Sequence, residues 1–279
     1  MAIRFGWLRA LLFLVTYLVV LTGVSFIPAP DLYTGYTVSF LATIGLWAAF
    51  TKWIDRIALA DTGLRWKGHG ADALAGFALA TALLGLGTSI LLLKGELRWM
   101  AVEWNGEAFL LSLGLMALVA VAEELVFRGY VLRNLLGSFK APIALLLSAA
   151  LFAVFHAANP NNGFLPLLNV FLAGLLLGVN YIFTRNCWFG MALHFAWNFL
   201  QGPVLGYAVS GLELPSVLQQ SEGNNKWLTG GAFGLEGSVL TTVLTAVSVV
   251  VLYFLYQPKK SHPSEQVAAQ KKYPFNREG

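Results

Sequence analysis

Long apolar stretches recur along the whole chain, and each is close to the length that crosses a lipid bilayer. A helix rises about 1.5 Å per residue, so about 20 apolar residues span the hydrocarbon core. Of the 279 residues, 57% are hydrophobic and only 11% are charged. So few charges do not suit a soluble domain, and the sequence predicts an all-α, polytopic membrane helical bundle of about eight transmembrane helices. The predicted spans are residues 7–27, 35–51, 71–93, 108–127, 141–158, 164–183, 188–206 and 238–256.

The basic residues predict the orientation of these spans. Lys and Arg collect in cytoplasmic loops. Clusters of them precede the first span and follow the second, fourth, sixth and eighth, which puts every cluster on one side of an eight-span path. Both termini are therefore expected in the cytoplasm, and the predicted location is the cell membrane. The net charge of +4 reflects these loops and a basic tail, so no nucleic-acid partner is expected.

The predicted spans divide the chain into four parts. Residues 1–107 hold the first three transmembrane helices, and residues 108–206 form a core of the next four. Residues 207–256 provide an extracytoplasmic loop and the eighth helix. Residues 257–279 are expected to be a flexible basic tail in the cytoplasm, because they are rich in Lys, Gln and Ser and poor in apolar residues.

Two adjacent carboxylates, Glu123 and Glu124, lie near the end of the fourth apolar stretch. An uncompensated charge inside a membrane helix is costly, so such groups usually face a protein interior or a wet cavity and serve a function. Residues four apart share a face of a helix, so Arg128 can pair with Glu124. This pairing would leave Glu123 facing another direction.

Later apolar segments supply polar partners at helical spacing. His156 follows Phe152 by four residues, and Asn198 follows His194 by four. Each of these groups alone is consistent with a hydrogen bond between helices. Together with Glu123, these residues lie on three apolar helices that hold few other strong polar groups. This distribution favours one shared site.

Such a site suits the hydrolysis of an amide bond inside the membrane. A carboxylate beside an imidazole can hold a water and take its proton, and a second imidazole and an amide can donate to an oxyanion. Two His and one Glu also form an open zinc set. We expect no cofactor, with zinc as the alternative, because Asn198 is a poor zinc ligand and the paired-histidine helix motif is absent.

Three motifs resemble those of the CAAX-protease and bacteriocin-processing (CPBP, or Abi) family of intramembrane endopeptidases, which includes type II CAAX prenyl endopeptidases. Glu123-Glu124-Leu-Val-Phe-Arg128 matches EExxxR, Phe152-Ala-Val-Phe-His156 matches FxxxH, and His194-Phe-Ala-Trp-Asn198 matches HxxxN. The resemblance covers about residues 108–200, with a weaker echo to Ser238. It implies that Glu124 and Arg128 support the other motif residues.

The resemblance implies a role for each remaining motif residue. It implies that Glu123 and His156 activate the water and that His194 and Asn198 stabilise the oxyanion. The implied substrate is a membrane or lipidated peptide or protein. The family is treated as glutamate-type, which favours a metal-independent hydrolase over a metalloprotease.

The predicted span boundaries conflict with a shared site. Glu123 falls toward the cytoplasmic end of the fourth span and His156 toward the opposite end of the fifth, on the order of 15 Å apart in depth. Either the fourth helix continues past Arg133, or the fifth stops short and residues 159–163 dip into a polar cavity. The sequence does not choose between these solutions.

Two other classes of function also fit the sequence. A proton-coupled transporter would use Glu123, Arg128 and the histidines as a relay, and its flux would depend on Glu123. A non-catalytic bacteriocin-immunity or membrane scaffold protein would bind a partner through residues 207–237. Its phenotype would survive the replacement of Glu123.

Overall fold

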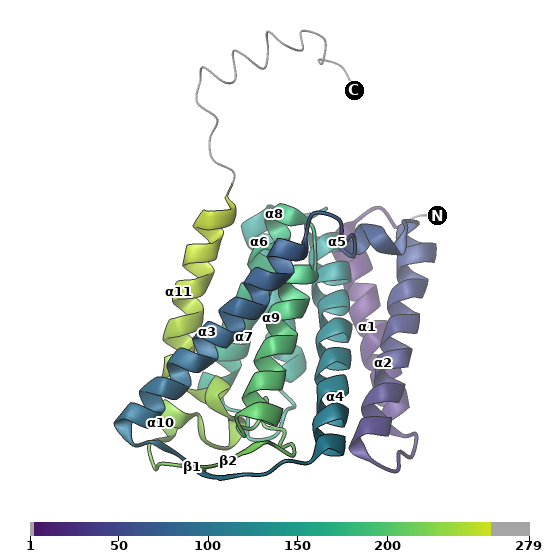
Figure 1. Ribbon diagram of the computed structural model, residues 1–279. Helices are drawn as coiled ribbons and strands as arrows, with labels where there is room; N and C mark the ends of the chain where they lie inside the picture. Colours follow the sequence, from purple (N-terminus) through teal and green to yellow (C-terminus); the bar gives the residue numbers. More distant parts are fainter. Residues whose placement is uncertain (1–2, 258–279) are drawn as a thin grey trace, which may run out of the picture.

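The computed structural model describes residues 3–257, so nearly all of the predicted basic tail at residues 257–279 lies outside the described residues. The helices run side by side as one bundle (Figure 1). Six of the described helices are long and apolar enough to cross a membrane, which makes the chain a multi-pass membrane protein. They are α1 (Gly6–Ser25), α2 with η1 (Leu32–Asp55), α3 (Gly70–Lys94), α4 with η3 and α5 (Gly106–Leu135), α7 with α8 (Phe164–Thr184) and α11 (Val239–Tyr256).

Two helices at predicted spans are shorter. α6 (Ala141–His156) is apolar but has 16 residues, which reach about 24 Å at 1.5 Å per residue. α9 (Trp188–Phe199) continues only through the π-helical segment η4 (Leu200–Val204). The eight crossings and the cytoplasmic termini stay predictions. α1 begins and α11 ends at the same end of the bundle (Figure 1).

Two short strands depart from the all-α prediction. β1 (Leu97–Val102) and β2 (Leu218–Glu222) pair antiparallel. Backbone outside a helix needs partners for its N–H and C=O groups, and this pairing supplies them. The fold is therefore mostly helical with one two-stranded sheet, which lies at the end of the bundle opposite to the start of α1 (Figure 1). The remaining short elements are η2 (Leu59–Thr62), α10 (Lys226–Thr229), η5 (Gly231–Phe233) and η6 (Leu235–Gly237).

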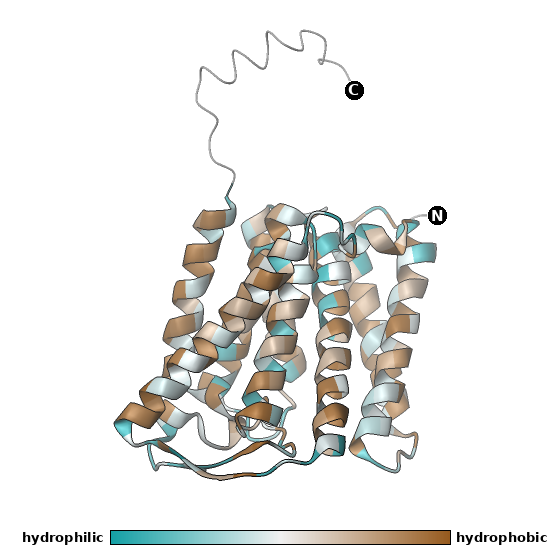
Figure 2. Cartoon of the chain, viewed as in Figure 1, coloured by the Kyte–Doolittle hydropathy of each residue, from teal (hydrophilic) through white to brown (hydrophobic). Residues whose placement is uncertain are grey.

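Most of the length of the long helices consists of hydrophobic residues (Figure 2), and many large apolar side chains on them are exposed. A soluble protein rarely exposes so much contiguous apolar surface, whereas lipid can cover it. The exposed residues include Val19 on α1, Leu93 on α3, Leu110 on α4 and Phe254 on α11, each more than half exposed. Their exposure is consistent with helices that face a bilayer.

The helix that begins with α4 (Gly106–Glu124) does not end near residue 127. It continues through the π-helical segment η3 (Leu125–Leu132) and through α5 (Arg133–Leu135). The fourth helix therefore continues past Arg133, and α6 stops at His156, after which Asn159 and Pro160 line the cavity described below. π-Helical segments inside longer helices are rare and often mark functional sites.

Two glycines let α7 lie close to its neighbours. A Cβ on Gly174 would lie 2.9 Å from the Cα of Ala149, and a Cβ on Gly178 would lie 2.6 Å from the Cδ1 of Leu145. Both neighbours belong to α6. A small residue every four positions thus permits the two helices to approach closely.

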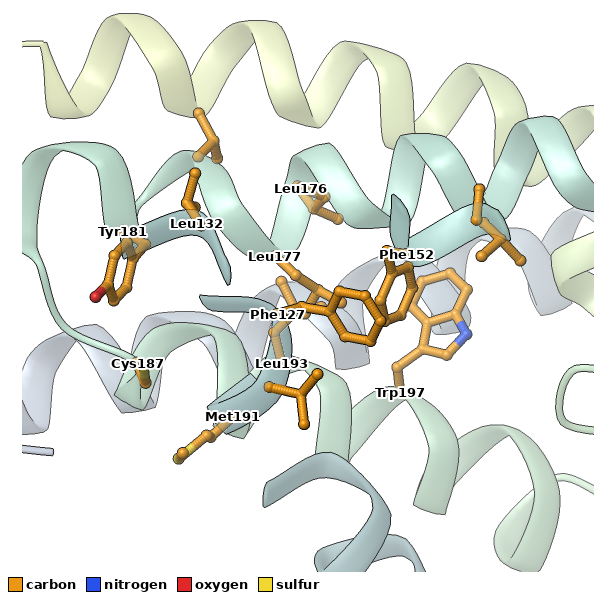
Figure 3. Close-up of a cluster of buried hydrophobic side chains, with 14 of the residues drawn as sticks. Phe127, Leu132, Phe152, Leu176, Leu177, Tyr181, Cys187, Met191, Leu193 and Trp197 are labelled. Atoms are coloured by element: carbon orange, nitrogen blue, oxygen red, sulfur yellow. The ribbon is translucent and has the colours of Figure 1, made fainter. Parts of the chain in front are cut away.

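The core that holds the site lies where η3, α6, α7 and α9 meet. Phe127 and Phe152 pack edge to face, with ring centroids 5.0 Å apart. Figure 3 shows them with Leu177, Leu193 and Trp197 in the same cluster of buried side chains. This apolar packing fixes the helices that carry the three motifs relative to one another.

Candidate active site

The motif residues gather around one internal cavity. Its volume is about 370 Å³, and its lining includes Glu123, His156, His194 and Asn198. α4 carries Glu123 at its end, α6 ends with His156, and α9 carries His194 and Asn198 one turn apart. The structure therefore brings together all four residues that the sequence singles out for catalysis.

Glu123 points a carboxylate oxygen at both histidines. Its Oε2 lies 3.6 Å from Nε2 of His156 and 3.8 Å from Nε2 of His194. Among the described residues this buried oxygen has no hydrogen-bond partner. Such atoms are rare and call for a partner such as water. Separations just beyond hydrogen-bond length are ones that a water can bridge.

The imidazole of His156 is fixed by its own helix. Its Nδ1 lies 2.8 Å from the carbonyl oxygen of Phe152, one turn earlier. A carbonyl only accepts, so Nδ1 carries the hydrogen and donates it. In the neutral ring, Nε2 then presents a lone pair toward Glu123. The FxxxH spacing thus sets both the ring orientation and its tautomer.

Glu124 and Arg128 form the predicted ion pair, and it is fully buried. Their side chains are 0% and 1% exposed. Arg128 donates from Nη1 to Oε1 of Glu124 at 2.7 Å and from Nη2 to the carbonyl of Gly174 at 2.9 Å. Its guanidinium also lies 4.8 Å from the ring centroid of Phe152. The pair ties η3 to α7 and α6 as well as neutralising the second carboxylate.

The same carboxylate orients His194. Nδ1 of His194 lies 3.2 Å from Oε1 of Glu124, which accepts its hydrogen. The other ring nitrogen, Nε2, is the atom that faces Glu123. Arg128, Glu124 and His194 therefore form a chain that holds the second imidazole toward the cavity, and Asn198 lines the cavity one turn further along α9.

Gly190 makes the space that Glu124 occupies. A Cβ at this position would lie 2.6 Å from Oε2 of Glu124 and 3.1 Å from the carbonyl oxygen of Leu177. Gly190 lies one turn before His194 on α9. Gly190 was not predicted from the sequence, because one glycine in an apolar helix carries little signal.

The first two helices also reach the site, although their sequences carry no motif. Tyr17 on α1 and Tyr36 on α2 line the cavity. Both also line a second cavity of about 680 Å³ between α1, α2 and α4, and Glu123 borders this cavity too. Glu123 thus lies where the two cavities adjoin.

A further carboxylate, Glu236 in η6, lines the cavity from outside the motifs. Its Oε2 accepts from the backbone N–H and the hydroxyl of Ser210 at 2.8 and 2.7 Å, and its Oε1 accepts from the indole of Trp197 at 2.9 Å. Desolvation raises the pKa of the Glu236 carboxyl, and the hydrogen bonds from Ser210 and Trp197 act in the opposite direction. The sequence signal for Glu236 was its place in the weaker family resemblance that extends to Ser238.

The donor set does not fit a metal in its present arrangement. Within residues 3–257, no three His, Cys, Asp or Glu side chains are grouped as a metal site requires. Glu123, His156 and His194 would have to move to become an open zinc set, and we derive no step through zinc. A reaction without a cofactor stays a prediction.

The fold and the site together define a multi-pass membrane protein with a carboxylate and two imidazoles inside its helical bundle. Residues 105–200 match the family model described as type II CAAX prenyl endopeptidase Rce1-like, so the chain contains a domain of this family. The matched range holds all three motifs. Comparison with curated proteins and with solved structures gives no match. The family implies a protease whose substrates are proteins or peptides.

Proposed function

We propose that this protein is an intramembrane endopeptidase that hydrolyses a peptide bond with a water activated by Glu123 and His156. The observation that carries the proposal is the position of the Glu123 Oε2, 3.6 and 3.8 Å from the two histidine Nε2 atoms inside one cavity. A water bridging these atoms would lie between a base and an oriented acceptor. The family match supports the same reaction class.

In the first step, Glu123 takes a proton from the water while the water oxygen attacks the carbonyl carbon of the scissile bond. The new C–O bond forms as the carbonyl electrons move to the carbonyl oxygen. Nε2 of His156 accepts the second hydrogen of the water in a hydrogen bond and so aligns its lone pair. General-base catalysis of this kind contributes about 10²- to 10⁴-fold.

The resulting oxyanion would be held by Nε2 of His194 and the amide of Asn198. Nδ1 of His194 already donates to Glu124 at 3.2 Å, so its Nε2 can donate only in the imidazolium form. The adjacent Glu124 carboxylate stabilises that positive charge. When the intermediate collapses, the C–N bond breaks and the proton on Glu123 passes to the leaving nitrogen. The products are a carboxylic acid and an amine.

The proposed reaction uses no metal, and the proposed substrate is a membrane-embedded or lipidated peptide or protein in the cell membrane. The cavity lies inside helices whose outer faces are apolar, so a peptide that is already in the bilayer needs no transfer from water to approach it. The apolar residues that line most of the cavity suit such a chain.

The test is Glu123-dependent cleavage. Purified protein in detergent micelles is incubated with a library of membrane-segment peptides, and products are identified by mass spectrometry. Glu123→Gln keeps the shape of the side chain but cannot take the proton, so cleavage should fall about 10²- to 10⁴-fold. Glu107→Gln, an exposed position on the same helix, is the matched control and should cleave normally. Normal cleavage by Glu123→Gln would show that this carboxylate is structural and not the base, whereas no cleavage of any peptide by the unaltered protein would favour the transporter or scaffold functions.

A further inference from the structure

The segment between η4 and α11 closes one side of the cavity, although it lies outside the range matched by the family. Ser210 and Glu236 are its polar lining residues. The segment is anchored near its middle, where β2 pairs with β1, and at its end, where η6 leads directly into α11. This segment is therefore a fixed wall of the site.

Glu236 connects this wall to α9. Its Oε1 accepts the indole N–H of Trp197 at 2.9 Å. Trp197 directly precedes Asn198 and follows His194 by three residues. The hydrogen bond thus fixes the rotation of the helix turn that presents both proposed oxyanion donors.

Ser210 connects the same wall to the end of α6. Its backbone N–H and hydroxyl donate to Oε2 of Glu236, and its carbonyl accepts from the side chain of Asn159 at 3.3 Å. The backbone N–H of Asn159 donates in turn to the carbonyl of His156 at 3.0 Å. Ser210 has a φ of 49°, a left-handed conformation that a non-glycine residue keeps only when its surroundings enforce it.

The backbone at Glu236 is held independently from α7. The side chain of Asn169 donates to the carbonyls of Glu236 and Ser238 at 2.6 and 2.8 Å. Three donors meet the Glu236 carboxylate, which suits its ionised form. A carboxylate can accept all three hydrogen bonds through its two oxygens, whereas a glutamine side chain can accept through one terminal atom only.

We propose that Glu236 is a positioning residue of the active site, whose carboxylate sets the spacing between the α6 end that carries His156 and the α9 turn that carries Asn198. This proposal rests on the peptidase function proposed above. Glu236 does not touch the reacting atoms. It acts through Trp197 on one side and Ser210 on the other.

The test compares Glu236→Gln with Glu222→Gln, a carboxylate in β2 that does not line the cavity. A glutamine can accept from Ser210 through its oxygen, but its NH₂ group then faces the indole N–H of Trp197. We expect kcat on the cleaved library peptide to fall roughly ten- to a hundredfold with little change in KM, as small misplacements of catalytic groups do. Glu222→Gln should match the unaltered protein.

Rescue separates positioning from simple loss of stability. Trp197→Phe removes the N–H that opposes the glutamine, so the variant with both Glu236→Gln and Trp197→Phe should recover the kcat of Trp197→Phe alone. A purely structural role predicts that the two losses add. Additive losses would overturn the proposal.

A second measurement does not depend on a substrate. In hydrogen exchange, Glu236→Gln should speed exchange of the amides in residues 157–163 and 205–212 relative to Glu222→Gln, because a glutamine cannot accept from Ser210 and Trp197 together and these segments lose their link to α9. Equal exchange in the two variants would also overturn the proposal. If Glu123→Gln is inactive while Glu236→Gln is normal, only the positioning role fails. Normal cleavage by Glu123→Gln would instead reject the proposed role of Glu123, and no cleavage by the unaltered protein would reject the peptidase function itself.

Discussion

Removing the positive charge from the buried ion pair should destabilise the protein far more than removing one from an exposed pair. In Arg128→Met, the side-chain volume is largely kept, but Glu124 loses a hydrogen bond of 2.7 Å and the Gly174 carbonyl loses one of 2.9 Å. The carboxylate, 0% exposed, must then protonate or stay charged without its partner. Breaking a buried pair in this way costs about 3–5 kcal/mol.

The chain offers a matched control with the same spacing. Arg65 and Asp61 are also four residues apart, but their side chains are 72% and 41% exposed. Exposed pairs contribute about 0–1 kcal/mol, so Arg65→Met should change the unfolding free energy little. Arg128→Met with Glu124→Gln removes both buried charges and should recover part of the stability that Arg128→Met loses.

The assay is reversible unfolding in mixed micelles, followed by circular dichroism as the fraction of denaturing detergent rises. The free energy of unfolding is compared for each variant with the unaltered protein. Equal losses in Arg128→Met and Arg65→Met would refute the reasoning, because burial would then not decide the cost. A double variant no more stable than Arg128→Met alone would show that the stranded Glu124 is not the source of the loss.

The other predictions concern the oxyanion, the glycine beside the ion pair, the metal and the topology. Asn198→Ala should lower kcat by about 10²- to 10³-fold, as the loss of one oxyanion donor does, and an unchanged kcat would remove Asn198 from the mechanism. Gly190→Ala should lower the free energy of unfolding by about 1–3 kcal/mol through overpacking. Gly114→Ala should not, because a Cβ at Gly114 meets nothing within 4 Å. Equal effects of the two substitutions would contradict the packing argument. Cleavage should survive a strong chelator, with far less than one zinc per chain by elemental analysis, and loss that added zinc reverses would favour a metalloprotease. With Cys187→Ser as background, a cysteine at Asn161 should react with an impermeant thiol reagent on intact cells, and reaction only after permeabilisation would reverse the predicted orientation.

The local geometry of the site follows from its spacing in the sequence. Positions four apart on a helix meet, and this places Arg128 on Glu124 and the imidazole of His156 on the carbonyl of Phe152. The apolar character of the long helices is likewise readable from composition alone. Contacts within one helical turn depend on few variables, which is why the sequence predicts them.

Contacts between helices depend on the whole packing arrangement, and there the sequence was less informative. The position of Glu123 relative to His156 depends on the continuation of α4 through the π-helical segment η3. No residue in the motif predicts this continuation. The space for Glu124 beside Gly190, and the link from Glu236 to Trp197, join segments far apart in the chain. Hydropathy also does not distinguish α6 and α9 from the longer helices, because apolar residues that face the interior and those that face lipid look alike.

The π-helical segment η3 changes the direction in which the side chains beyond it face around the helix axis. An α-helix turns about 100° per residue, so a turn that holds an extra residue rotates everything beyond it relative to everything before it. Before η3, Glu123 faces the cavity, whereas beyond it Arg133 and Asn134 both donate to Asp55 at the end of η1. If a single residue were deleted from η3 and Glu123 still faced the cavity, Arg133 and Asn134 would be rotated away from Asp55. Contacts on both sides of η3 thus fix the helix that carries the first motif. The number of residues between these contacts cannot change, whereas the length of a loop can.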